Sequence, residues 1–438
     1  MNVPAHRLAM PYFMSPSPMH EPSVFARPWV QLALGIVCMA AVANLQYSWT
    51  NFVNPINAKY HWGLAAIQVA FTIFVLIETW LVPVEGYLVD RFGPRPVVIG
   101  GGILVALAWS LNSVAGSLGT LYFAAAVGGV GTGAVYGTCV GNALKWFPAR
   151  RGMAAGFTAA GFGAGAALTV APISRMIESS GYEHAFVFFG LLQGAVVVVA
   201  ALGMLRAPAA YLAAAPTHSQ SARGFTPTEV LRTPVFWVMY VMFVLVASGG
   251  LVMIASMKPI AIDLGVARIP VSLFGLTMAA GVFAITLQRV LDGIGRPFFG
   301  WLSDQIGREN TMAIAFVIGA AALFTVRRSG SNPLVFVLVT ALYFGVFGEI
   351  YSLFPATQGD TFGGRYAAAN AGMLYTAKGA GALLVSFATA MAARSGWHSV
   401  FDVAMTFNLI AAALGLFVLK PMRVKHFAAI RAAADTAR

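Results

Sequence analysis

The sequence reads Gly86-Tyr-Leu-Val-Asp90-Arg-Phe-Gly93-Pro-Arg95 after a long apolar stretch, and 214 residues later it reads Gly300-Trp-Leu-Ser-Asp304-Gln-Ile-Gly307-Arg308. Glycine allows a tight turn, and an acidic residue near a helix end can pair with neighbouring arginines. We therefore expect these two turns to hold two parts of the chain together and to gate movement between them. The gating residues would be Asp90, Arg91, Arg95, Asp304 and Arg308.

Repetition extends beyond these turns. Pro83 and Pro297 keep the offset of 214, as do Glu78 and Asp292. Segment 157–164, Phe-Thr-Ala-Ala-Gly-Phe-Gly-Ala, recurs 218 residues later as Tyr-Thr-Ala-Lys-Gly-Ala-Gly-Ala at 375–382. Nearly constant offsets predict two halves of one ancestral design. Parallel halves with a site between them at the middle of the membrane are typical of a carrier.

Composition places these halves in a membrane. Hydrophobic residues make up 59% of the 438 positions and charged residues 10%, against roughly 45–50% and about 25% in soluble domains. The net charge is +12, but the basic residues are scattered at segment ends and form no stripe. We therefore expect no nucleic-acid partner and a lipid bilayer around most of the chain.

Twelve apolar segments are long enough to cross a bilayer, which takes about 20 residues. They are 29–51, 65–89, 97–116, 119–144, 152–175, 185–206, 234–257, 271–302, 311–326, 333–357, 366–393 and 398–419. We predict an all-α membrane protein with twelve transmembrane helices in two pseudo-symmetric six-helix bundles. The bundles would be 29–206 and 234–419, joined by a cytoplasmic linker at 207–233 and flanked by cytoplasmic tails at 1–28 and 420–438.

Lysine and arginine set the expected orientation. With both termini cytoplasmic, the cytoplasmic segments hold seventeen of the 27 lysines and arginines and the opposite side holds seven, which follows the positive-inside rule. Residues 1–27 lack the apolar core and cleavage site of a signal peptide. We expect a multi-pass protein of the cell (inner) membrane that functions as a monomer.

Three short segments indicate more closely which class of membrane protein this is. These are Gln46-Tyr47-Ser48-Trp49-Thr50, Arg296-Pro297-Phe298 and Ala377-Lys378. They resemble the bacterial oxalate–formate antiporters of the major facilitator superfamily, whose loop signature the turn at 86–95 also resembles. Two further segments, from Trp146 to Gly161 and from Asp292 to Pro297, are similar to motifs of monocarboxylate transporters. The resemblance runs from about 29 to 420 and implies the major facilitator fold.

Arg296 and Lys378 lie inside apolar spans, where a charge costs roughly 2.5–3.5 kcal/mol on insertion scales. At the equivalent places in the other half the sequence has Val82 and Ala160, so the fold does not need a cation there. Two unmatched cations facing one cavity suit an anion, and a guanidinium can bind a carboxylate through two parallel hydrogen bonds. The alternative is that each cation forms a structural salt bridge with a nearby acid.

Three acids inside the spans are candidates for proton coupling or charge tuning: Asp292, Glu349 and Glu78. Arg289, Asp292 and Arg296 share one helix face, so Asp292 can neutralise Arg296 and take a proton, or pair with Arg289 in a purely structural role. Glu349 can offset Lys378 across the cavity, or either glutamate can only tie helices together. Glu78 and Glu349 depart from the oxalate–formate pattern, which makes strict dicarboxylate exchange less expected.

If the resemblance holds, aromatic and amide side chains complete the pocket. Aromatic walls exclude water, and a tyrosine hydroxyl can donate to a carboxylate. The expected substrate-binding residues, besides Arg296 and Lys378, are Gln46, Tyr47, Tyr136, Tyr351, Tyr375 and Phe347. Any one of these can instead be plain helix packing.

The sequence therefore predicts a secondary carrier for small organic anions. Exchange of carboxylates, as in oxalate–formate antiport, is the leading hypothesis, and proton-coupled uptake of a monocarboxylate such as lactate or pyruvate is the alternative. A non-transporting membrane sensor of the same fold is a third hypothesis. No histidine is central in a span and no Gly-Lys-Ser/Thr loop for a nucleotide is present, so we expect no enzyme activity, no metal and no cofactor.

Overall fold

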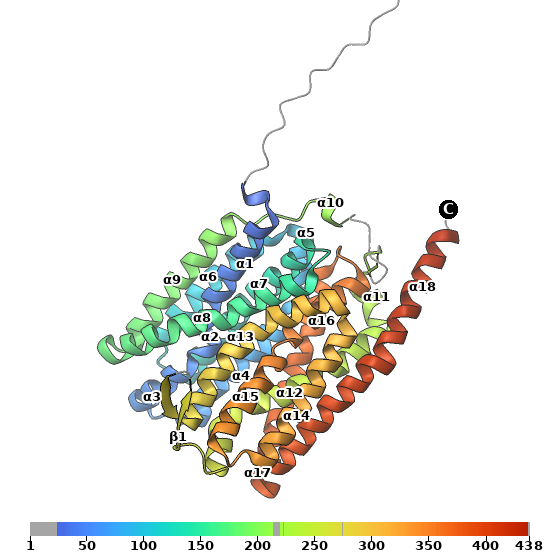
Figure 1. Ribbon diagram of the computed structural model, residues 1–438. Helices are drawn as coiled ribbons and strands as arrows, with labels where there is room; N and C mark the ends of the chain where they lie inside the picture. Colours follow the sequence, from blue (N-terminus) through green and yellow to red (C-terminus); the bar gives the residue numbers. More distant parts are fainter. Residues whose placement is uncertain (1–23, 213–219, 222, 274, 437–438) are drawn as a thin grey trace, which may run out of the picture.

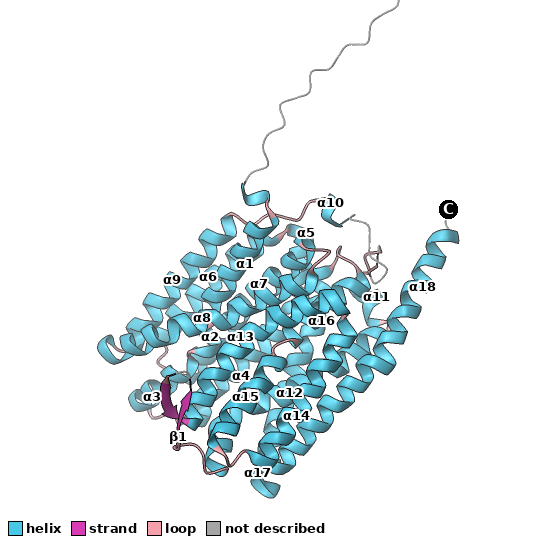
Figure 2. Ribbon diagram, viewed as in Figure 1, coloured by secondary structure: helices cyan, strands magenta, loops and turns pink. Residues whose placement is uncertain are grey.

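The computed structural model describes residues 24–212, 220–221, 223–273 and 275–436. Most of the expected N-terminal tail, part of the expected linker and the last two residues lie outside the described residues. Within them the chain is a bundle of long helices (Figure 1), and a two-stranded hairpin is its only sheet. Figure 2 shows how little of the ribbon is not helical.

The first part of the chain forms six spans. They are built from α1 (Pro28–Val42), α2 (Asn44–Tyr47) and α3 (Trp49–Tyr60) in series, α4 (Leu64–Trp80) with α5 (Val82–Phe92), α6 (Pro94–Ser113), α7 (Leu118–Trp146), α8 (Arg151–Ser180) and α9 (Tyr182–Leu202). A break at Leu81 bends α4 from α5 by 43°. Short helices α10 (Ala209–Leu212) and α11 (Pro227–Leu231) follow.

The second part repeats this order. It contains α12 (Pro234–Asp263), the hairpin β1 (Pro270–Leu273) and β2 (Leu276–Ala279), α13 (Ala280–Ile306), α14 (Arg308–Ser329), α15 (Pro333–Phe347) with α16 (Ile350–Phe362), and α17 (Ala367–Ala413). Gly396 interrupts the helical backbone of α17, which is thus two helices. A π-helical turn, Leu414–Leu419, leads into α18 (Lys420–Thr436), so the expected C-terminal tail is largely helical.

Nine helices of the described chain are long and apolar enough to cross a membrane, or up to ten if the bent pair α4–α5 is one span. The other two predicted spans correspond to α13 and to the part of α17 before Gly396. These two segments contain Arg289, Asp292, Arg296 and Lys378. The two predicted spans that have no full counterpart among these candidates are therefore the ones that carry the candidate cations.

One boundary prediction was wrong. The eighth span was placed at 271–302, but residues 270–279 form an antiparallel hairpin in which Pro270 faces Ala279 and Leu273 faces Leu276. The hairpin lies at the end of the bundle opposite α10 and α11 (Figure 1). An apolar run by itself does not distinguish a strand from a helix, and α13 begins only at Ala280.

The repeated turns have the same backbone geometry. Gly93 ends α5 with a φ of 93° and Gly307 ends α13 with a φ of 92°, a left-handed conformation in which a Cβ is unfavourable. Both glycines follow the last helical turn directly and precede the next helix, α6 or α14. The sequence repeat at 86–95 and 300–308 is therefore also a structural repeat.

The two halves contact each other closely along two helix pairs. On α13, a Cβ at Gly300 would lie 2.2 Å from the backbone oxygen of Gly152 on α8. On α5, a Cβ at Gly86 would lie 2.5 Å from the backbone oxygen of Ala368 on α17. Gly300 is the repeat equivalent of Gly86, so both pairs use equivalent glycines for backbone contact.

The last part of the expected linker, from Phe225 onward, is fixed to the second half. Phe225 donates its backbone N–H to the carbonyl of Phe362 at 2.9 Å, and Asn370 donates to the carbonyl of Phe225 at 3.0 Å. Thr226 and Glu229 form a capping box at the start of α11, which satisfies donors that a helix N-terminus leaves free.

Candidate functional site

Arg296 lies in the middle of α13 with 3% of its surface exposed. Its Nη2 donates to Asp292 Oδ2 at 2.6 Å, and its Nη1 donates to the backbone oxygen of Ala159 on α8 at 2.9 Å. Its Cζ lies 4.7 Å from the ring centre of Tyr351 on α16. Nε has no hydrogen-bond partner among the described residues. Because a guanidinium has five N–H donors, Arg296 can bind a further acceptor.

Lys378, on α17, is 4% exposed and is held by two neighbours. Its Nζ donates to the hydroxyl of Tyr375 at 2.8 Å and lies 3.3 Å from Glu78 Oε2. The hydroxyl of Tyr375 in turn donates to Glu78 Oε1 at 3.3 Å. Glu78 comes from α4 and is fully buried, so this cluster joins the two halves of the chain.

A continuous chain of aromatic rings connects the first half to the second. The contacts, by centroid distance, are Tyr47–Phe162 at 5.4 Å, Phe162–Tyr136 at 5.5 Å, Tyr136–Tyr375 at 4.6 Å, Tyr375–Tyr351 at 6.4 Å and Tyr351–Phe347 at 6.0 Å. Arg296 lies over Tyr351 and Lys378 binds the hydroxyl of Tyr375. The structure thus places both cations beside two adjoining rings.

Other expected pocket residues lie at the edges of this chain. Gln46 is next to Tyr47 on α2, and its Oε1 is buried without a hydrogen-bond partner. Phe347 packs against Gly250 of α12, where an added Cβ would lie 1.9 Å from the ring. Phe347 therefore lies between the ring chain and α12.

The acidic residues inside the spans pair with partners that differ in part from those expected. Asp292 pairs with Arg296, and not with Arg289, whose Cζ lies 4.9 Å above the ring of Tyr47. Glu78, and not Glu349, pairs with Lys378. Glu349 is fully buried where α15 meets α16, and both its carboxylate oxygens lack a hydrogen-bond partner among the described residues.

Glu85 was not singled out from the sequence. It lies on α5, seven residues after Glu78, is 4% exposed, and neither carboxylate oxygen has a hydrogen-bond partner in the described chain. A Cβ on Gly133 of α7 would lie 2.7 Å from its Oε2. The sequence alone could have identified Glu85 as a candidate, because it is an acidic residue inside the span predicted at 65–89.

At the end of the bundle that holds the repeated turns, each turn aspartate binds the start of a helix from the other half. Asp90 accepts a hydrogen bond from the backbone N–H of Ala369 on α17 at 3.1 Å. Asp304 accepts from the backbone N–H groups of Gly152 at 3.1 Å and Met153 at 2.9 Å on α8. A carboxylate at a helix N-terminus is favoured by the unpaired N–H groups and the helix dipole.

Asp360, at the end of α16, is a further connection at this end. It accepts from Arg151 Nη1 of α8 and from Arg308 Nε of α14, each at 2.9 Å, and Arg308 also lies 2.6 Å from Asp304. Asp360 was missed because it falls just beyond the span predicted at 333–357.

The expected arginine partners of Asp90 lie elsewhere. Asp90 pairs with Lys145 of α7, whereas Arg95 donates to the backbone oxygen of Met204 at 3.3 Å. The guanidinium of Arg91 lies over the ring of Phe92. Both arginines thus interact within the first half, and Lys145 takes the role expected for them.

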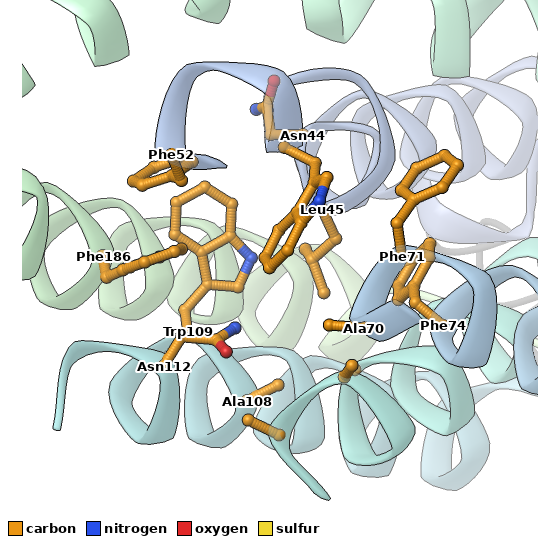
Figure 3. A pocket seen from close by; sticks show the side chains of 14 residues that line it. Asn44, Leu45, Phe52, Ala70, Phe71, Phe74, Ala108, Trp109, Asn112 and Phe186 are labelled. Atoms are coloured by element: carbon orange, nitrogen blue, oxygen red, sulfur yellow. The ribbon is translucent and has the colours of Figure 1, made fainter. Parts of the chain in front are cut away.

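Two hollows in the described chain lie away from the cations. The pocket in Figure 3 has a volume of about 20 Å³, and Asn44 and Asn112 are polar among mainly apolar side chains of the first half. That volume suits about one water molecule. A second hollow of about 170 Å³ lies between α12 and α17 and is lined by Ser248 and apolar residues. Neither is lined by Arg296 or Lys378.

Comparison with known proteins identifies the family of this chain. The family model described as Major Facilitator Superfamily matches residues 33–292. An oxalate:formate antiporter from Oxalobacter formigenes is 36% identical over 400 residues, which cover 90% of this chain and 92% of the relative. Human monocarboxylate transporter 11 is 27% identical over 225 residues, covering 51% of this chain and 45% of the relative.

Solved structures support the same fold. The proton:xylose symporter XylE superposes with a TM-score of 0.65 at 13% identity, covering 90% of this chain and 96% of that one. FucP in its outward conformation gives a TM-score of 0.65 at 14% identity, covering 88% and 98%. The chain belongs to the major facilitator superfamily of membrane transporters. The predicted all-α membrane fold and the resemblance to the oxalate–formate and monocarboxylate families are confirmed.

Proposed function

We propose that this protein is a secondary active carrier that exchanges one small carboxylate for another, with Arg296 and Lys378 holding the carboxylate. The main support for this proposal is that both cations are almost fully buried beside adjoining aromatic rings, in the middle of long helices. A buried cation without a function is costly, and the repeat has apolar residues at both equivalent positions. The oxalate:formate antiporter named above supports a carboxylate as the substrate.

Alternating access follows from the way the two halves meet. Bundles 29–206 and 234–419, joined by 207–233, would rock about the site between them. Asp90, Asp304 and Asp360 hold the halves together at one end. Substrate would enter from the opposite end, and its release at the closed end requires these contacts to break.

Placement in the cell completes the proposal. The excess of lysine and arginine assigns the Asp90 end to the cytoplasm, with both termini on that side, in the inner membrane of a bacterial cell. The carrier would function as a monomer, because the site lies between two halves of one chain. It would be a transporter and not an enzyme.

Proton-coupled uptake of a monocarboxylate is the second candidate. Asp292 supports it, because one oxygen of its carboxylate binds Arg296 while the other, Oδ1, has no partner in the described chain. A substrate carboxylate that competes for Arg296 would weaken its hold on Asp292. Asp292 would then be available to carry a proton, which would link proton and substrate movement.

Uptake by the purified protein in liposomes tests the proposal. The panel is oxalate, formate, lactate, pyruvate and malonate, each with and without a pH gradient and with and without an internal carboxylate. Exchange predicts uptake that depends on the internal carboxylate, and symport predicts uptake driven by an acidic exterior alone. Binding of a carboxylate without uptake in either mode would instead favour a sensor.

Arg296→Gln and Lys378→Gln should each abolish uptake while the protein still expresses and folds. Each change removes one of the two charges that the substrate needs. Full transport by either variant would contradict the assignment of the binding site.

A further inference from the structure

The candidate site contains two ion pairs, which hold as many acidic groups as basic ones. Its two cations, Arg296 and Lys378, are 3% and 4% exposed, and their partners, Asp292 and Glu78, are 7% and 0% exposed. The pairs lie 2.6 Å and 3.3 Å apart. With all four groups ionised, the formal charge of the site is zero.

The two pairs differ in construction. Asp292 and Arg296 are one turn apart on α13, so their distance is set by one helix. Glu78 and Lys378 are brought together from α4 and α17, and Tyr375 bridges them through its hydroxyl. The longer separation of this second pair means a weaker contact, which another carboxylate can replace more easily.

Glu78 occupies a hydrogen-bonding position on Lys378 that a substrate carboxylate would otherwise be expected to take. An ammonium has three N–H donors, and Lys378 directs one to Tyr375 and one to Glu78. The remaining donor of Lys378 and the free Nε of Arg296 are the donors that the two cations leave for a substrate. A second substrate carboxylate would find Asp292 and Glu78 already bound to the two cations.

We infer that Glu78 is a specificity residue, which acts as a built-in carboxylate for Lys378 and limits the substrate to one negative charge. The inference rests on the proposed function and names its substrate class as monocarboxylates. A monoanion leaves one uncompensated charge in the buried site, whereas a dianion leaves two. An uncompensated charge in a region of low dielectric constant is strongly unfavourable.

Equilibrium binding to the purified full-length protein tests the inference. Lactate and malonate are matched in carbon number and carry one and two negative charges at pH 7.5. Their apparent dissociation constants are measured by thermal stabilisation at constant ionic strength. The wild type should bind lactate at least about tenfold more tightly than malonate. Glu78→Gln should reduce this preference by about tenfold or more, the size expected for one charge-assisted contact.

Glu85→Gln is the matched control. It removes a second buried carboxylate from the same span, and Glu85 has no partner in the described chain. The lactate-to-malonate ratio should stay that of the wild type. An equal change of the ratio in both variants would overturn the role of Glu78, since it would reflect general charge removal from the span.

Different experimental outcomes would contradict the role of Glu78 and the proposed transport function. Tighter malonate than lactate binding by the wild type would overturn the inference, and so would an unchanged ratio in Glu78→Gln. The wild-type comparison does not depend on whether Glu78→Gln folds. Absence of binding for the whole carboxylate panel would overturn the proposed function itself.

Discussion

Arg296 makes three different contacts with one planar group. It binds Asp292 and the carbonyl of Ala159 through two nitrogens while its face covers Tyr351. An ammonium is a point charge without this flat, forked geometry. We therefore expect the charge at position 296 to be necessary but not sufficient for substrate binding, because the shape of the guanidinium also contributes.

Arg296→Lys should consequently lose most transport, by about tenfold or more, because at least one charge-assisted hydrogen bond is lost. Uptake of the carboxylate that the liposome panel identifies is the measurement. Arg289→Lys, on the same helix, is the control and should retain transport, since Arg289 makes a ring contact with Tyr47. Wild-type uptake by Arg296→Lys would show that only the charge matters.

A substitution at Asp292 distinguishes the two proposed coupling modes. We expect Asp292→Asn to remove accumulation driven by a pH gradient and to leave carboxylate exchange in place, because an amide cannot carry the proton. Both modes are measured in the same liposomes, as uptake with an acidic exterior and as counterflow at equal pH. Accumulation by Asp292→Asn when only pH drives it would rule out Asp292 as the coupling residue.

The residues of the site were more predictable than their partners. Arg296 and Lys378 stood out because the other half has Val82 and Ala160 at the equivalent positions. The contact of Lys378 with Glu78 joins residues 300 positions apart. It depends on how α4 and α17 are rotated against each other, which neither the apolar pattern nor the repeat specifies.

At the scale of the element, Gly295 allows α13 to approach α15 closely. A Cβ on Gly295 of α13 would lie 1.9 Å from the backbone oxygen of Gly345, so the two helices are in backbone contact. Close approach of this kind is what small residues permit in membrane helices. It brings the Asp292–Arg296 pair against the junction of α15 and α16.

Gly348→Ala should therefore disturb the site, whereas Gly345→Ala should be tolerated. A Cβ at Gly348 would lie 2.4 Å from Asp292 Oδ1, but at Gly345 its nearest contact would be 3.5 Å, to Leu291. We expect Gly348→Ala to weaken substrate binding by about tenfold, the size of one charge-assisted contact. Thermal stabilisation by the bound carboxylate measures this, and equal affinities in both variants would contradict it.

At the scale of the whole molecule, the two halves are joined twice by the same kind of contact, in which an aspartate binds a helix N-terminus. Asp90 binds the start of α17, and its repeat equivalent Asp304 binds the start of α8. The sequence repeat predicted a paired function for the turns. It did not predict the helix N-termini as partners, because a backbone N–H group has no sequence signature.

Asp90→Asn should slow turnover with little change in substrate affinity. The amide weakens contacts with Lys145 and Ala369 at the end of the bundle without altering Arg296 or Lys378. Asp304→Asn should behave alike, since it serves the equivalent position. The rate of exchange and the apparent dissociation constant are measured together, and lost affinity with normal turnover would contradict this role.

The backbone contact between Gly152 and Gly300 has a practical consequence. A single methyl group at Gly300 would lie 2.2 Å from the oxygen of Gly152, so α8 and α13 could not close there. Gly300→Ala would thus transport poorly but be a useful sample. Its molecules would collect in the form whose binding site is open toward the end that Asp90 and Asp304 close in the wild type. Imaging of that variant would show the half of the transport cycle that the wild-type fold conceals.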